Sequence, residues 1–556
     1  MIRSSARQRR HAGQEHPTQP TRWWPRWLLT GIALVCGCAV GLGFAPYNCW
    51  WLVPLGLAGL VSVCLLSTTK VGLLRGYVFG LGLAGVAFPW IGVLGIAILS
   101  VFIAYLALWY AIFGLVVAAT RRTPVWGFAG AATWMVIEWV SSRWPMGGFG
   151  WGNLSYTAAD APVNGLFPWI STTGVSLVIL TSGFLLAWMI RPLIEHRSIR
   201  AWRPVSVILT AAVLVVSGSA GLAGRSYDPA PDSGSVTVAV VQGNVPGTGI
   251  EALGPIYTVE NNHLSETILL AAKIRTGQAK QPDFVLWPEN STATDPLQDQ
   301  RTAQIVNLAL DLSRAPVLVG SITLGPGPDQ RATTALWYTP DQGVTATYQK
   351  RNLVPFGEWI PARSVMLKLI PMLNAVGAQS IPGTNPGVLN VSTDSGPLRV
   401  GILICFEVSY DTTFDQMITG DQATGGGAQV VTVQTSNAMF TGSDQMSQQD
   451  QITRIRAMES RREILVATTN SLAGLINSKG QIVYEAKLGT SDSQVFTVPL
   501  RTTITPAVAF GGWIDLSSVV LPLIGCLVVG LVSRRRRVSG LAGGGIIDPL
   551  PTLEKP

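Results

Sequence analysis

Long apolar runs and one long mixed stretch divide this chain into two kinds of sequence. Eight apolar windows of roughly 17–25 residues have the length needed to cross a membrane as helices, and they lie at about 28–44, 50–67, 73–92, 97–119, 125–142, 168–190, 204–223 and 513–532. The pattern predicts seven transmembrane helices over 28–223 and an eighth over 513–532, with a separate domain over 224–512. Residues 1–27 and 533–556 are expected to be tails.

The third window is rich in glycine, at Gly76, Gly80, Gly82 and Gly85. Small residues let helix backbones approach closely in lipid. We therefore expect this helix to pack tightly against its neighbours.

Within the mixed stretch, short apolar runs alternate with helical patterns. The runs 236–242, 283–287, 316–320, 398–404, 429–434 and 464–468 predict strands, and about 256–274, 299–313, 409–419 and 444–462 predict helices. Such alternation is typical of a layered α/β fold that holds catalytic residues at the ends of its strands.

Composition and charge support a membrane protein. The chain has 48% hydrophobic and 13% charged residues, against about 25% charged in soluble domains. Arginine and lysine gather before the first window and in alternate loops, with Arg143 as an exception. The positive-inside rule then places both termini in the cytoplasm and the 224–512 domain outside it. The net charge of +8 follows from this topology, and it does not predict nucleic-acid binding.

Cys405 is the one cysteine of the outer domain, so an intradomain disulfide is excluded there. A nucleophilic thiol needs a base or a cation nearby. His263 is the one histidine of that domain and would have to carry a Cys–His pair, whereas Glu289 ends an apolar run as a candidate base. Lys350, which precedes a Gly/Pro turn, could support the thiolate and an oxyanion.

Each of these residues also has a structural interpretation. Cys405 could be an inert buried thiol, Glu289 could cap the following segment, and Lys350 could be a solvated loop lysine. The order Glu, Lys, Cys nevertheless favours an acyl-transferring thiol enzyme. The sequence has no paired metal-ligand spacing, so no metal or cofactor is expected.

Three motifs resemble the nitrilase (carbon–nitrogen hydrolase) superfamily and, within it, the apolipoprotein N-acyltransferases. They are Val285-Leu-Trp-Pro-Glu289, the stretch from Lys350 through Val354-Pro-Phe-Gly-Glu358-Trp-Ile-Pro361, and Ile404-Cys405-Phe-Glu407. In the membrane part, Phe44-Ala-Pro46, Glu138 and Gly148-Phe-Gly-Trp151 are similar to landmarks of that family.

The resemblance implies an αββα nitrilase-like domain on an eight-helix bundle of a bacterial cell membrane. It also implies that Glu289 is the base, Lys350 the partner of the thiolate and oxyanion, and Cys405 the nucleophile. Glu358 would be a second carboxylate that steadies the lysine and the base, while Trp287 and Glu407 would line or brace the site. An acyl group would pass from a phospholipid through a Cys405 thioester to the α-amine of the N-terminal diacylglyceryl-cysteine of an apolipoprotein, in a ping-pong reaction.

The chain departs from the family pattern at Phe406, where many members have Tyr, and at Gly150, where they have Pro. The first change removes a hydroxyl from the site. The apolar segment 359–373 could be a core helix, or it could dip into lipid so that acyl chains reach Cys405.

Two other functions remain alternatives at this point. One is a membrane-tethered amidase or nitrilase that hydrolyses its thioester with water, and the other is a non-catalytic membrane scaffold. Some actinobacterial members are fused to a polyprenyl-phosphate mannosyltransferase domain. Because about twenty residues follow Arg537, we expect such an enzyme here only as a separate partner.

Overall fold

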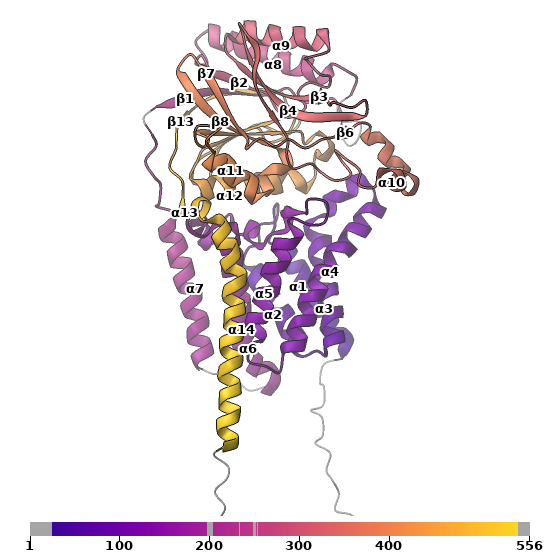
Figure 1. Ribbon diagram of the computed structural model, residues 1–556, viewed down its shortest axis with the longest axis vertical. Coiled ribbons are helices and arrows are strands. Elements are labelled where there is room, and N and C mark those ends of the chain that lie inside the picture. Colours follow the sequence, from indigo (N-terminus) through magenta and orange to yellow (C-terminus); the bar gives the residue numbers. More distant parts are fainter. Residues whose placement is uncertain (1–24, 197–203, 233, 248–251, 253, 543–556) are drawn as a thin grey trace, which may run out of the picture.

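The computed structural model describes residues 25–196, 204–232, 234–247, 252 and 254–542. A bundle of helices carries a β-sandwich at one end, and α7 and α14 lead into and out of that sandwich (Figure 1). Most of both predicted tails lies outside the described residues, as do the loop arginines Arg197, Arg200 and Arg203.

Each predicted membrane window overlaps a helix of the bundle. These helices are α1 (Arg26–Gly41), α2 (Leu52–Leu65), α3 (Thr69–Ala87), α4 (Ile96–Thr120), α5 (Trp126–Ser141), α6 (Phe167–His196), α7 (Pro204–Gly224) and α14 (Gly511–Ala542). Among the described residues, five helical segments are long and apolar enough to cross a membrane: 69–87, 96–120, 162–192, 204–224 and 511–533. The apolar helices α1 and α2 are shorter, with 16 and 14 residues, and α5 has 16 residues.

Close backbone contacts hold α3 against its neighbours. A Cβ atom on Gly76 would lie 2.1 Å from the Tyr110 carbonyl oxygen of α4, and one on Gly82 would lie 2.4 Å from the Leu34 oxygen of α1. A Cβ atom on Gly80 would lie 2.6 Å from the Cα atom of Ala107 in α4, so three of the four glycines support the expected tight packing of this helix. Gly85 makes no close contact of this kind, because a Cβ atom there would meet nothing within 4 Å.

Short 3₁₀ turns link the bundle helices at the end that faces the sandwich. They are η1 (Pro89–Leu94), η2 (Gly150–Gly152), η3 (Leu154–Ala158) and η4 (Pro162–Leu166). This end of the bundle is therefore built from tight turns that lie against the sandwich.

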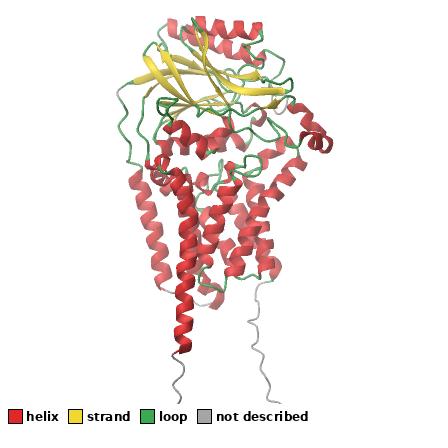
Figure 2. Cartoon of the chain, in the orientation of Figure 1, coloured by secondary structure: helices red, strands yellow, loops and turns green. Residues whose placement is uncertain are grey.

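Two sheets form the centre of the sandwich (Figure 2). The first has the order β13-β1-β2-β3-β4-β5, with β6 paired to β4, and the second has the order β12-β11-β10-β9-β8-β7. The strands of the first sheet are β1 (Ser235–Gln242), β2 (Phe284–Leu286), β3 (Val317–Leu324), β4 (Gln330–Thr339), β5 (Gly343–Gln349), β6 (Gln379–Ser380) and β13 (Asp492–Pro499). Those of the second are β7 (Val388–Thr393), β8 (Gly396–Ile404), β9 (Val430–Thr435), β10 (Ile464–Thr468), β11 (Gly474–Ile476) and β12 (Ile482–Glu485).

Helices cover the outer face of each sheet, which completes an αββα order of layers. Buried side chains of α8 (Thr258–Arg275) and α9 (Gln300–Ser313) pack on the first sheet. Those of α11 (Asp411–Thr419) and α12 (Asp444–Ser460) pack on the second, in a core that continues into the bundle. A third core fills the space between the sheets. The predicted α/β fold and the layer order implied by the resemblance are both confirmed.

The sandwich rests on the bundle through polar contacts as well as apolar ones. The buried amide of Gln448 on α12 accepts hydrogen bonds at its oxygen from the indole nitrogens of Trp90 and Trp151, each at 3.0 Å. Its nitrogen donates to the carbonyl oxygens of Ala45 and Ala87, at 3.0 and 2.7 Å. One side chain thus joins the sandwich to three separate loops of the bundle.

Candidate active site

Strand ends bring Glu289, Lys350 and Cys405 to one edge of the sandwich. Glu289 comes shortly after β2, and Lys350 and Cys405 directly follow β5 and β8. Strands β2, β3 and β5 run in one direction, because β2 is parallel to β3 and two antiparallel steps lead from β3 to β5. The amide nitrogen of Gln434 on β9 donates to the Trp287 carbonyl oxygen at 2.6 Å, which ties the strand ends of the two sheets together.

Lys350 is a buried cation between two carboxylates. Its Nζ atom lies 2.9 Å from Oε1 of Glu289 and 2.8 Å from Oε1 of Glu358, and its side chain is 1% exposed. Burial alone would lower the pKa of Lys350, but the two carboxylates raise it well above its ordinary value. The interpretation of Lys350 as a solvated loop lysine is therefore wrong.

Glu289 faces the lysine and the second sheet, away from the segment that follows it. Its Oε1 atom accepts from Lys350, and its Oε2 atom accepts from the backbone N–H of Ser436 at 2.8 Å. Burial raises the pKa of Glu289, and the Lys350 ammonium partly offsets that effect. The alternative that Glu289 is a local cap is wrong, and its raised pKa suits a general base.

Cys405 begins the 3₁₀ turn η8 (Cys405–Ser409) and has a φ of +52°. That left-handed conformation is costly for a residue with a side chain, and such residues gather at functional sites. Burial and the Glu289 carboxylate raise the pKa of Cys405 to about 12, against the opposing effects of Lys350 and a hydrogen bond with Thr435. The resting group is therefore a thiol, and it needs a base in order to react.

Glu358 is the second carboxylate that contacts Lys350. Its Oε2 atom accepts from the backbone N–H of Val354 at 2.7 Å, while Oε1 accepts from the lysine. The Pro355–Trp359 turn thereby sets the position of the Glu358 carboxylate. This contact with Lys350 is the one that the resemblance implies.

Glu407 joins the lysine segment to the cysteine segment. It is fully buried, and its Oε1 atom accepts from the backbone N–H of Arg351 at 2.6 Å while Oε2 accepts from that of Ile404 at 2.8 Å. The Tyr348 hydroxyl donates to both oxygens, at 2.9 and 3.0 Å. Glu407 therefore braces the site by fixing the residues next to Lys350 and Cys405.

The Trp287 side chain does not line the candidate site. Its ring lies in the outer core of the first sheet, where its indole nitrogen donates to the Thr267 hydroxyl at 3.1 Å. His263 lies in the same layer, 5.7 Å from the Trp287 ring, and its Nδ1 atom is 2.7 Å from the Val259 carbonyl oxygen. Because Cys405 packs against the core between the sheets, the Cys–His alternative is wrong.

Gly320 lets β3 approach the candidate base. A Cβ atom there would lie 2.2 Å from the Pro288 carbonyl oxygen and 2.7 Å from the Cα atom of Glu289. Gly320, the Ser436 amide and Thr435 were not predicted from the sequence. A glycine inside an apolar strand is itself a signal of a close backbone approach. Among the described residues, no three His, Cys, Asp or Glu side chains are grouped so that they could hold a metal ion.

Comparison with known proteins identifies the family. A model of the apolipoprotein N-acyltransferase N-terminal domain matches residues 36–185. Over 493 residues the chain is 30% identical to the apolipoprotein N-acyltransferase of Mycolicibacterium smegmatis, covering 85% of this chain and 80% of that relative. This chain belongs to the apolipoprotein N-acyltransferase family. The family member of Methylococcus capsulatus is 28% identical over 549 residues, which cover 93% of this chain and 98% of the relative.

Solved structures that resemble this apolipoprotein N-acyltransferase family member are more distant. A mutant amidase from Nesterenkonia sp. AN1 is 17% identical, with a TM-score of 0.35 over 49% of this chain and 93% of that chain. A branch 10 member of the nitrilase superfamily from Saccharomyces cerevisiae is 14% identical, with the same TM-score and the same shares of both chains.

The two departures from the apolipoprotein N-acyltransferase pattern lie next to each other in space. The Phe406 ring stacks on Trp151, with centroids 5.2 Å apart and planes 10° apart. A Cβ atom on Gly150 would lie 2.9 Å from the Ser409 carbonyl oxygen. Phe406 and Gly150 thus both shape the contact between the bundle and η8, the turn that carries Cys405.

Proposed function

We propose that this chain is an apolipoprotein N-acyltransferase that uses Glu289, Lys350 and Cys405 as its catalytic residues. It transfers a fatty acyl group from a phospholipid to the α-amino group of the N-terminal diacylglyceryl-cysteine of a lipoprotein. The observation that carries this proposal is the 30% identity to a relative of that name over most of both chains. The contacts among Glu289, Lys350 and Glu358 support it, because they place a base beside a cation.

The first half-reaction forms a thioester. The Cys405 sulfur attacks an ester carbonyl of the phospholipid while Glu289 takes the thiol proton, and Lys350 stabilises the negative charge on the carbonyl oxygen. The tetrahedral intermediate then expels the lysophospholipid alkoxide, which takes the proton from Glu289. An acyl group is left on the Cys405 sulfur.

The second half-reaction transfers that acyl group to an amine. The α-amine of the diacylglyceryl-cysteine attacks the thioester carbonyl, and Glu289 takes a proton from the nitrogen. The Cys405 thiolate leaves and recovers the proton from Glu289, so that an amide forms and the enzyme is restored. Because Lys350 keeps its charge, it supports the oxyanion in both half-reactions.

Membrane placement completes the proposal. Eight bundle helices, including the shorter α1, α2 and α5, would cross a bacterial cell membrane, with both termini in the cytoplasm and the sandwich outside. The asymmetry of loop arginines supports this orientation. An outer site suits substrates that are themselves held in the membrane.

The segment after Glu358 offers a route for acyl chains. It contains the short helix α10 (Arg363–Leu369), which has no buried residue and exposes Val365 and Leu369. The core-helix alternative for this part of the 359–373 segment is therefore wrong. We propose that α10, which lies at the side of the sandwich nearer the bundle in Figure 1, enters the bilayer surface and guides chains toward Cys405.

An acylation assay with the purified full-length chain tests this function. With phospholipid alone, we expect a hydroxylamine-sensitive acyl adduct on Cys405, which a diacylglyceryl-cysteine peptide should discharge as its N-acyl product. The Cys405→Ser variant should form neither species. An adduct that appears only with the acceptor would exclude the ping-pong order, and equally fast discharge by water would favour the hydrolase alternative.

A further inference from the structure

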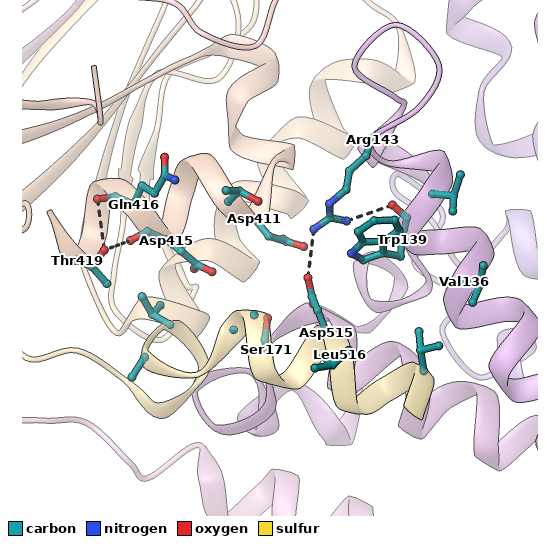
Figure 3. Close-up of a pocket in the computed structure, with 17 residues that line it drawn as sticks. Val136, Trp139, Arg143, Ser171, Asp411, Asp415, Gln416, Thr419, Asp515 and Leu516 are labelled. Carbon is teal, nitrogen blue, oxygen red and sulfur yellow. Dashed lines mark hydrogen bonds and ion pairs between the residues drawn. The ribbon is translucent and has the colours of Figure 1, made fainter. Parts of the chain in front are cut away.

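A pocket lies where the sandwich meets the bundle, away from the candidate catalytic residues. It has a volume of about 760 Å³, is partly open to the outside, and is lined by residues of α5, α6, α11, α13 (Pro506–Ala509) and α14 (Figure 3). Glu289, Lys350, Glu358 and Cys405 are absent from the described residues that line it. We call it the junction pocket. Its volume is within the range of about 300–1,000 Å³ that is usual for ligand sites.

One side of the junction pocket is apolar and faces the surroundings of the bundle. Val136 and Trp139 line it from α5, and Leu516 and Val519 line it from α14. The first three of these side chains are exposed, and α14 contains a segment that can cross a membrane. An exposed tryptophan beside such a segment is typical of the boundary between acyl chains and head groups.

The other side of the junction pocket is acidic. Asp515 of α14 pairs with Arg143 at 3.2 Å, and Asp411 of α11 pairs with the buried Arg456. Asp415 differs, because it has no hydrogen bond or ion pair with any other described residue through its carboxylate. Figure 3 shows that carboxylate pointing into the pocket.

The charges around the junction pocket are not balanced. Its three aspartates and Glu459, which also pairs with Arg456, outnumber the two arginines. Burial and the Glu459 and Asp411 carboxylates raise the pKa of Asp415 well above its ordinary value, so its negative charge is costly without a cation. A Cβ atom on Gly511 would lie 2.6 Å from Oδ2 of Asp415, so the glycine leaves space beside the carboxylate.

We propose that the junction pocket binds a phospholipid whose head group carries an ammonium ion, as a resident lipid and not as an acyl donor. The ammonium ion donates to Asp415, since three N–H donors on a compact cation suit a group of carboxylates. The phosphate lies near Arg143, and the acyl chains follow the apolar side between α5 and α14. Anionic lipids are disfavoured, because their net negative charge is repelled by the surplus carboxylates of the pocket.

The junction pocket is connected to the candidate nucleophile through Arg456. The guanidinium group of Arg456 pairs with Asp411, and its Nε atom donates to the Val408 carbonyl oxygen of η8 at 2.8 Å. A lipid bound beside Asp411 and Asp415 therefore supports the turn that begins with Cys405. This effect is one of positioning, since the lipid does not reach the reacting atoms.

Photocrosslinking to an ester-free lipid tests the proposal. The probe is a dialkyl ether phosphatidylethanolamine with a diazirine in one chain, which has no ester for Cys405 to attack. The full-length chain is placed in nanodiscs of dialkyl phosphatidylglycerol, and labelled peptides are mapped by mass spectrometry. We expect the phosphatidylethanolamine probe to label α5 and α14. Labelling of these helices should be about tenfold weaker with a matching phosphatidylglycerol probe. It should also be about tenfold weaker in Asp415→Asn, the effect expected for the loss of one charge-assisted hydrogen bond.

The control variant is Asp394→Asn, which removes an exposed carboxylate from a turn of the sandwich and should label like the natural chain. Equal labelling by the two probes would overturn recognition of the ammonium group. Unchanged labelling in Asp415→Asn, or labels confined to α10 and the strand ends around Cys405, would overturn the site itself. Because the readout is binding to an unreactive lipid, its result is independent of the proposed acyltransferase reaction.

Discussion

At neutral pH, Cys405 is held as a thiol because burial and the Glu289 carboxylate act in the same direction. Both raise the pKa of the thiol, whereas Lys350 lowers it. A cysteine that waits as a thiol is protected from stray alkylation and oxidation, since the thiolate is the reactive form. The proton must then be removed at the moment of attack, and Glu289, with its raised pKa, is suited to that task.

Replacing the two charged neighbours should change the reactivity of Cys405 in opposite directions. Glu289→Gln removes the negative charge, so the thiol pKa falls from about 12 and alkylation at pH 8 becomes faster. Lys350→Met removes the positive charge, so the pKa rises further and alkylation becomes slower. The rate of acyl transfer should fall in both variants. In Lys350→Met it should fall by about 10²–10³ or more, because the preorganised charge beside the oxyanion is lost.

Iodoacetamide labelling of the Cys405 peptide, followed by mass spectrometry, measures those rates. Cys526, which lies in α14, is the internal control, and its labelling should not change. If both variants shifted the Cys405 rate in the same direction, the division into a base and a supporting cation would be wrong.

Glu289, Lys350 and Cys405 could be predicted from the sequence, because Glu289 and Cys405 stand at the ends of apolar runs and Lys350 precedes a Gly/Pro turn. The groups that hold them could not. Glu407 accepts from the backbone of Arg351 and Ile404, and Glu289 accepts from the backbone of Ser436. Backbone amides carry no residue signature, so contacts between distant segments of this kind appear only in the folded chain.

Among the elements, the parallel strands were predictable and most antiparallel ones were not. The runs that became β1, β2, β3, β8, β9 and β10 are apolar because they are covered on both faces. By contrast, β5 reads Gly343-Val-Thr-Ala-Thr-Tyr-Gln349 and is largely exposed or half-buried. Because of this polar composition, β5 was not predicted as a strand, although it places Lys350 in the candidate site.

Strand β3 approaches Glu289 closely because it has a glycine at position 320. Gly320→Ala would place a methyl group against the backbone of Pro288 and Glu289, and neither atom can rotate away. Such overpacking costs about 1–3 kcal/mol. We expect a lower melting temperature and a large loss of acyl transfer, because Glu289 is displaced from Lys350.

The same substitution at Gly85 is the matched control, since a Cβ atom there meets nothing within 4 Å. Gly85→Ala should retain both stability and activity. Full activity of Gly320→Ala would show that the position of Glu289 tolerates a displaced β3.

On the scale of the whole molecule, both connections between bundle and sandwich are clamped. The Arg461 guanidinium group donates to the Gly224 carbonyl oxygen at the end of α7, at 2.9 Å. Arg462 donates to the Arg501 carbonyl oxygen at 2.7 Å, and Arg501 itself pairs with Glu463. Together with Gln448, these contacts hold the site at a fixed height above the bundle, which suits substrates whose reacting groups lie at a membrane surface.

The proposed orientation of the chain can be tested with two exposed positions on opposite sides of the bundle. Asp394 lies in the turn between β7 and β8 of the sandwich, and Thr123 lies in the loop between α4 and α5. In spheroplasts, a membrane-impermeant maleimide should label Asp394→Cys at once and Thr123→Cys only after lysis. The physical reason is the neighbouring pair Arg121 and Arg122, which should be retained in the cytoplasm. The reverse pattern would place Cys405 in the cytoplasm, where an exported lipoprotein could not be its acceptor.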